Sequence, residues 1–172
     1  TARAGGAPTF NGVAFTQADQ TRTATETGCE LWYLINPTTG SSKTISVPNT
    51  GSKTLYVQAS TYKAETGVSL FDDDAGATGV SANPSVTATS SMDGDVIIGV
   101  MGNGNTNAPT SPTGTGLNAT DNGQHSDSNQ YKLQTSKGAW ATGWTVGSDD
   151  WCMVVAAFKV LLAKSITAAV KN

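Results

Sequence analysis

Trp151-Cys-Met-Val-Val-Ala-Ala-Phe158 is the stretch that decides the fold of this chain. It contains no charge, proline or glycine, and it is rich in β-branched and large apolar residues. The turn-forming segment Gly147-Ser-Asp-Asp150 comes directly before it. An apolar run of this length, opened by a turn, is typical of a strand that is buried on both faces. We therefore expect the rest of the protein to pack around this strand.

Shorter runs along the chain also have strand character. Strands are expected at residues 7–10, 13–16, 29–35, 43–47, 54–62, 85–89, 95–101, 130–134 and 139–146. The first two flank Asn11-Gly12, and Asn-Gly accepts the positive φ angles of the type I′ turn in a tight β-hairpin. About nine or ten short strands without a convincing helix predict an all-β fold, an antiparallel β-sandwich or jelly roll.

Apolar residues alternate with polar ones in two neighbouring segments, 43–47 and 54–62. Such alternation is typical of strands with one buried face, so Ile45 and Val47 are expected to face inward. The Asn-Thr-Gly-Ser turn residues lie between the two segments. We therefore predict that they form a second hairpin.

Two polar segments are harder to place. Residues 17–28, rich in Thr, are interpreted as a loop or an edge strand. Residues 102–127 consist largely of Gly, Asn, Thr, Pro and Ser, with almost nothing to bury. We interpret them as a long exposed loop, and such loops on β scaffolds often carry function.

Length and charge restrict the class of protein. A chain of 172 residues is long enough to form one domain with a sizeable core. The net charge is −3 and no cluster of Lys or Arg stands out, which argues against a nucleic-acid partner. The longest apolar run is well short of the ~20 residues that a membrane helix needs.

The C-terminal segment carries apolar residues beyond what a finished sandwich requires. We therefore expect a β-sandwich domain over residues 1–159 and an arm or short helix over 160–172. The candidate contact residues with a neighbouring molecule are Leu161, Leu162, Ile166 and Val170. A frayed terminus is the alternative.

Cys29 and Cys152 both fall in or at the start of expected strands. Facing strands could bring them together as a disulfide across the sandwich. Two reduced, buried cysteines are the other interpretation, and a pair alone is not a disulfide framework.

The ionisable residues suggest no catalytic centre. His125, the single histidine, lies in the loop-like Asp121-Asn-Gly-Gln-His-Ser-Asp127, where a solvated side chain is favoured over a Ser-His-Asp arrangement. Asp72-Asp-Asp74 is interpreted as an acidic turn rather than a calcium loop, because its spacing lacks alternating ligands. No enzymatic activity, metal or cofactor is expected.

Trp140 and Trp144 allow two interpretations. Exposed tryptophans on a sheet face form platforms for sugar rings, and residues four apart in a strand share one face. Packing in the core is the commoner position of tryptophan in a sandwich.

Three segments together resemble a β-sandwich module of tailed-phage virion proteins and bacterial surface proteins. They are Pro8-Thr-Phe-Asn-Gly-Val-Ala-Phe-Thr16, Glu30-Leu-Trp-Tyr-Leu-Ile-Asn-Pro-Thr-Thr-Gly40 and Asp149-Asp-Trp-Cys-Met-Val-Val-Ala-Ala-Phe-Lys159. The resemblance covers most of residues 7–159 and implies a capsid decoration, tail-appendage or surface-binding function. It transfers no catalytic residue.

The chain departs from that module at both ends. Only Thr1–Gly6 precedes the Asn-Gly hairpin, where such modules have an apolar strand, and an extra tail follows Lys159. A missing strand would leave an edge open, so we expect strand addition by the tail of another copy or by another protein.

The expected function is that of a non-enzymatic structural protein on the virion surface, a capsid decoration (cement) or tail-appendage subunit. Its partners would be the major capsid or tail protein and copies of itself in a homo-oligomer. One alternative is a carbohydrate-binding module of the cell surface that uses Trp140 and Trp144 to hold glycans. Another is an extracellular filament subunit joined by donated strands.

Overall fold

The computed structural model describes residues 6–24, 27–49, 55–62, 70–121 and 126–159. Within these ranges the secondary structure consists of strands without a helix, and all strand pairs are antiparallel. The strands are β1 (Thr9–Phe10), β2 (Val13–Ala14), β3 (Thr16–Arg22), β4 (Gly28–Tyr33), β5 (Ile45–Ser46), β6 (Phe71–Ser81), β7 (Ser85–Ser90), β8 (Val96–Asn103), β9 (Thr115–Asp121), β10 (Ser126–Leu133), β11 (Gly138–Gly143) and β12 (Asp149–Phe158). The expected all-β, sandwich-like fold is confirmed.

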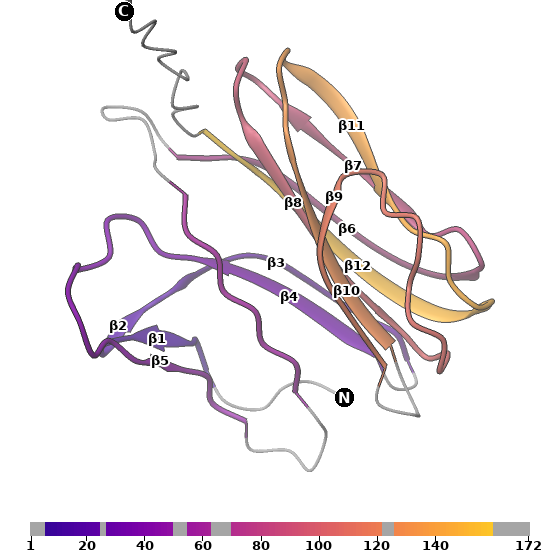
Figure 1. The fold of residues 1–172 in the computed structure, drawn as a ribbon, viewed down its shortest axis with the longest axis horizontal. Helices are drawn as coiled ribbons and strands as arrows, with labels where there is room; N and C mark the ends of the chain where they lie inside the picture. The colour runs from indigo at the N-terminus through magenta and orange to yellow at the C-terminus, as the bar shows by residue number, and fades with distance from the viewer. Residues whose placement is uncertain (1–5, 25–26, 50–54, 63–69, 122–125, 160–172) are drawn as a thin grey trace, which may run out of the picture.

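Strand β12 lies inside the largest sheet, whose order is β6-β12-β8-β10-β9 (Figure 1). It pairs with β6 on one side and with β8 on the other. Alternate residues of β12 belong to two separate apolar clusters, with Met153 and Val155 in one and Val154 and Ala156 in the other. The expectation of a strand buried on both faces is therefore confirmed.

The pair β7–β11 covers one face of the five-stranded sheet. The first apolar cluster fills the space between them and includes Val86, Trp140, Trp144 and Met153. Gly99 of β8 permits this close packing, because a β-carbon there would collide with the methyl group of Thr142. The absence of a side chain at Gly99 therefore brings β11 close to the sheet.

The pair β3–β4 covers the opposite face. Cys29 and Leu31 of β4 pack against Cys152, Val154 and Ala156 of β12. At one end of this layer three aromatic rings from β4, β6 and β12 meet. Their centroids are 5.5 Å apart for Tyr33 and Phe71, 5.4 Å for Tyr33 and Phe158, and 6.0 Å for Phe71 and Phe158.

A small sheet of order β2-β1-β5 lies apart from the main sheet, beside β3 and β4 (Figure 1). Its hairpin turns at Asn11 and Gly12, which have φ angles of 49° and 85°. Positive φ at both central residues is what a type I′ turn requires, so the predicted tight hairpin is confirmed.

The predicted second hairpin is wrong. Strand β5 pairs with β1, and residues 55–62 are not in a strand. Ile45 is exposed rather than inward-facing. Residues 55–62 instead contact β10 through side chains: Gln58 hydrogen-bonds to Asn129, and the ring centroids of Tyr62 and Tyr131 are 6.3 Å apart. Alternation indicates which side chains share a face, but it does not identify the partner strand.

Two strands of the structure are not predicted by the sequence patterns. Residues 71–81 form β6, and part of the expected loop 102–127 forms β9 at the edge of the sheet. Strand β6 is rich in Gly and Ala because its neighbours come very close. A β-carbon at Gly79 would lie 2.7 Å from the ring of Trp151, and one at Gly76 would collide with Asp19 and Thr21. Of the two interpretations of residues 17–28, the strand is confirmed for residues 17–22, which belong to β3.

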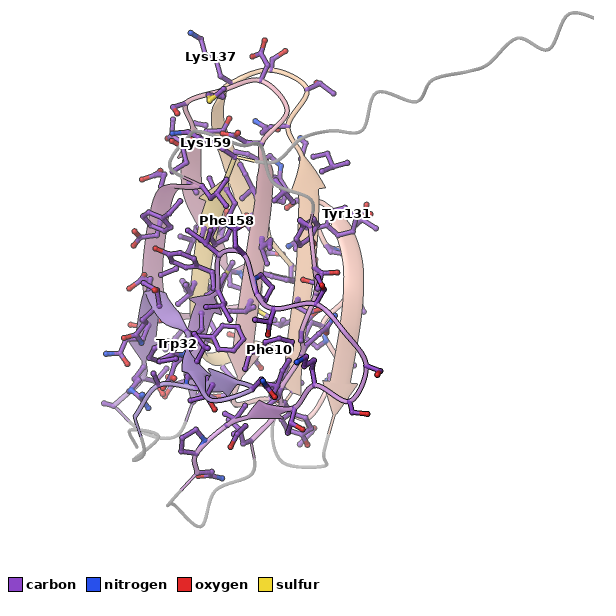
Figure 2. All side chains as sticks on the ribbon, turned by 90° about the vertical axis from the view of Figure 1, so that its left-hand side faces the viewer. Phe10, Trp32, Tyr131, Lys137, Phe158 and Lys159 are labelled. Atoms are coloured by element: carbon purple, nitrogen blue, oxygen red, sulfur yellow. The ribbon has the colours of Figure 1, made fainter. Side chains whose placement is uncertain are left out.

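The described part of the chain contains no helix long and apolar enough to cross a membrane. Figure 2 shows Lys137 and Lys159 near the top of the view and Phe10 and Trp32 in its lower half.

Candidate functional site

An apolar row crosses the small sheet. Phe10 of β1 is directly opposite Val13 of β2 and Ile45 of β5. Directly opposed residues on neighbouring strands project to the same face, so these three side chains form a continuous row. The side chain of Val13 is 52% exposed and that of Ile45 is 39% exposed, while Phe10 is half-buried. The opposite face carries Thr9, Ala14 and Ser46, which are small or polar.

Backbone hydrogen bonds hold this row in place. The N–H of Asn11 donates to the carbonyl of Thr44 at 2.9 Å, and the N–H of Phe15 donates to the carbonyl of Pro8 at 2.9 Å. Strands of two residues bury little by themselves, and an isolated hairpin of this size is marginally stable. A partner that covered the exposed row would therefore bury apolar surface that the small sheet leaves in contact with water. Leu55 and Val57 add further exposed apolar side chains in the following segment.

The acidic triplet lies in a strand, so its interpretation as a turn is wrong. Asp73 of β6 accepts a hydrogen bond from the backbone N–H of Thr89 at 2.7 Å. Asp72 accepts hydrogen bonds from the N–H and the hydroxyl of Ser91, both at 2.6 Å. The two carboxylates thus satisfy donors of Thr89 in β7 and of Ser91 just after it, at the corner where β6 meets this covering layer.

The same corner contains a coupled carboxyl pair. Burial, together with the hydrogen bond and negative charge of Asp72, raises the pKa of Asp95 to about 6. For Asp72 burial acts in the opposite direction, but hydrogen bonds from Ser91 and Lys159 prevail and lower its pKa. The ammonium nitrogen of Lys159 lies 3.1 Å from Oδ1 of Asp72. These interactions tie together β6, β12 and the start of β8.

This corner does not have the form of a metal site. Among the described residues, no group of three or more His, Cys, Asp or Glu side chains is arranged to hold a metal ion. The carboxylates of Asp72 and Asp73 instead accept hydrogen bonds from the backbone amides of Ser91 and Thr89. Asp93, in the turn before β8, likewise accepts a hydrogen bond from the N–H of Lys137 at 2.7 Å.

Trp140 and Trp144 belong to the apolar core. Their side chains are only 9% and 3% exposed, and both pack with Val86 and Met153. The ammonium group of Lys132 lies 5.2 Å from the ring centroid of Trp140. The sugar-platform interpretation requires exposed rings at these two positions, and it is therefore wrong. The core interpretation is confirmed because Trp140 of β11 and Trp144, just after this strand, both belong to the apolar cluster between β11 and the central sheet.

Several sequence candidates lie outside the described residues. They are His125 and the expected contact residues Leu161, Leu162, Ile166 and Val170. The apolar row was not recognised in the sequence as a surface, although Phe10 and Val13 flank the Asn-Gly turn. Its third member, Ile45, is distant in sequence and joins the row only through the β1–β5 pairing.

Comparison of the chain with protein-family models, with curated proteins and with solved structures found no significant match.

Proposed function

We propose that this protein is a non-enzymatic structural subunit that acts by binding other proteins on the surface of a virion, as a capsid decoration or a tail appendage. The observation that carries the binding function is the exposed row Val13, Phe10 and Ile45 on the small sheet. The resemblance of the three segments to virion modules supports the location.

The size of the row favours repeated weak contacts over one strong contact. Complete burial of a Val or Ile side chain contributes about 1.5–3 kcal/mol, and these side chains are already partly covered. A row of three residues is too small for a stable interface of the usual size, which buries roughly 1,200–2,000 Å². In a symmetric particle many copies add their contacts, so modest individual affinity gives firm attachment.

The shifted carboxyl groups support a structural function. Asp72 and Asp95 have perturbed pKa values, which in an enzyme would mark groups facing a substrate cleft. Here Asp72 accepts hydrogen bonds from Ser91 and pairs with Lys159, and Asp95 lies buried beside it. Their pKa shifts follow from burial and from the hydrogen bonds that hold the strands together.

The row can be tested with matched lysine variants of the full chain. Val13→Lys and Ile45→Lys place a charge in the row, whereas Ser46→Lys places the same charge on the opposite face, next to Ile45. Self-association is measured by sedimentation velocity, and binding to purified particles depleted of this protein by co-sedimentation. We expect both row variants to lose association and Ser46→Lys to retain it, with thermal unfolding unchanged in all three. Equal association of all variants contradicts the proposal.

The location is tested separately. Particles purified from the source of this chain should contain it in a fixed ratio to the major capsid or tail protein. Its absence from such particles would refute the virion location, while the lysine variants would still report on association. Open-ended polymers of the isolated chain would favour the filament alternative, and specific binding on a glycan array would favour the carbohydrate alternative.

A further inference from the structure

Cys29 and Cys152 face each other across two layers of the fold. Cys29 belongs to β4, in the covering layer, and Cys152 belongs to β12, in the central sheet. Both are free thiols, their sulfur atoms are 2.8 Å apart, and Cys29 Sγ lies 3.2 Å from the carbonyl oxygen of Cys152. Of the two interpretations of this pair, the structure has the reduced form, with the two sulfurs already in contact.

The surroundings hold the sulfur atoms together. Both side chains are buried, with 7% exposure for Cys29 and none for Cys152. Leu31, Val154 and Ala156 pack around them. Gly102 of β8 makes room, because a β-carbon there would lie 3.4 Å from the sulfur of Cys152 and 3.5 Å from that of Cys29. A disulfide bond is about 2.05 Å long, so bond formation requires an approach of less than about 1 Å.

We propose that Cys29 and Cys152 form a redox site in which a small disulfide oxidant converts the thiol pair into a cross-layer disulfide between β4 and β12. The proposal rests on the contact between two buried sulfurs from different layers, and it is independent of the apolar row and of the proposed function.

The reaction is two successive thiol–disulfide exchanges. The thiolate of one cysteine attacks a sulfur of the oxidant, so that a mixed disulfide forms and one thiolate of the oxidant leaves. The other cysteine loses its proton to solvent and attacks the protein sulfur of the mixed disulfide. The second half of the oxidant then leaves as a thiolate and takes up a proton. The protein pair loses two electrons and two protons, and the oxidant is reduced to two thiols.

The environment determines which sulfur ionises first. Burial raises the pKa of the Cys29 thiol. The hydrogen bond from Cys29 lowers the pKa of Cys152, although burial of Cys152 opposes this effect. The first negative charge therefore resides on Cys152. Because both sulfurs are buried, an oxidant reaches them only when the β3–β4 layer opens locally, so the exchange is slow in the native state.

The disulfide would join residues 123 positions apart in the sequence. A cross-link that closes a loop of this length removes much of the conformational freedom of the unfolded chain. It would also fasten β4, and with it β3, to the central sheet. We expect the oxidised protein to unfold at a temperature roughly 10 °C higher than the reduced protein.

The test uses the full chain, fully reduced and then incubated with oxidised glutathione in urea below the unfolding transition, which increases local opening. The exchange is then stopped with acid, and the protein is transferred to denaturant at neutral pH, treated with a maleimide and weighed by mass spectrometry. We expect a chain lighter by two hydrogen atoms, without bound maleimide or glutathione, and a proteolytic fragment that links Cys29 to Cys152. Retention of both free thiols, stable glutathione adducts or disulfide-linked dimers would overturn the proposal.

Cys29→Ala and Cys152→Ala are the matched controls. Each leaves a single cysteine, so the oxidant can form only an adduct, and the rise in unfolding temperature upon oxidation should disappear. The oxidised parent is compared with the same sample after reduction, which excludes differences in folding between variants. If oxidation lowers the unfolding temperature of the parent, the native fold does not accommodate the bond and the proposal fails.

Discussion

Asp95, buried directly before β8, is hydrogen-bonded to Asp72 of β6. The pair links two strands that are not neighbours in the sheet, since β12 lies between them. Two adjacent carboxyls do not both ionise readily in a buried setting, so one retains its proton at a higher pH than usual. This relationship makes the stability of the fold depend on pH.

We predict that Asp95→Asn stabilises the protein more at pH 7.5 than at pH 4.5. The pKa of Asp95 is about 6 in the folded state, above the ordinary value of an aspartate carboxyl. A raised pKa in the folded state contributes stability that is fully present below the unfolded pKa and is lost as the pH rises through the folded pKa. Asparagine stays neutral throughout and avoids this loss. Urea unfolding of both proteins at the two pH values measures the effect.

Asp72→Asn is the matched control for the direction in which stability changes with pH. The folded pKa of Asp72 is lowered, so its contribution is present above the unfolded pKa and is lost as the pH falls. This variant should therefore be most destabilised near neutral pH. A stability difference that is the same at both pH values for either variant would show that the pair does not titrate as described.

The position of β12 predicts a large cost for truncating its buried side chains. Val154→Ala should destabilise the protein by about 2–3 kcal/mol, because the lost methyl groups leave a cavity between the sheet and β3–β4. Val80→Ala removes the same atoms from a side chain that is 69% exposed in the adjacent strand. It should change stability by less than about 0.5 kcal/mol. Equal effects in urea unfolding would contradict burial of β12 on both faces.

Gly79 of β6 lies against the ring of Trp151, and we predict that it tolerates no β-carbon. Gly79→Ala should cost about 1–3 kcal/mol, because the ring is held in the core and cannot move away. Thr78→Ala alters the exposed neighbouring position in the same strand and serves as the control. Thermal and urea unfolding measure both. A neutral Gly79→Ala would mean that β6 and β12 can separate without loss.

The type I′ turn predicts opposite outcomes at its two central residues. Gly12 has a φ of 85°, so Gly12→Ala should weaken the β1–β2 hairpin by about 1 kcal/mol. Asn11→Gly should be tolerated, because glycine adopts the positive φ of that position without strain. Hydrogen exchange at the amides of Asn11 and Phe15 reports on the small sheet directly. Faster exchange in Asn11→Gly than in Gly12→Ala would exclude this turn.

Local sequence patterns predicted the structure correctly where the physical cause of that structure lies within one short segment. The apolar run at 151–158 must be buried on both faces wherever it lies, and Asn11-Gly12 supplies its own turn geometry. Local patterns failed to predict the structure where its physical cause is a contact with another strand. Strand β6 is composed of small residues because Asp19, Thr21 and Trp151 approach it, and none of these is near in sequence.

The sequence by itself determined the all-β class, the doubly buried strand and the tight hairpin. The tertiary structure alone decided that Ile45 joins Phe10 and Val13 in an exposed row, that Trp140 and Trp144 are core residues, and that Cys29 meets Cys152. The physical reason is that the side-chain period of a strand specifies which residues share a face, whereas strand pairing and layer packing join segments far apart in the chain.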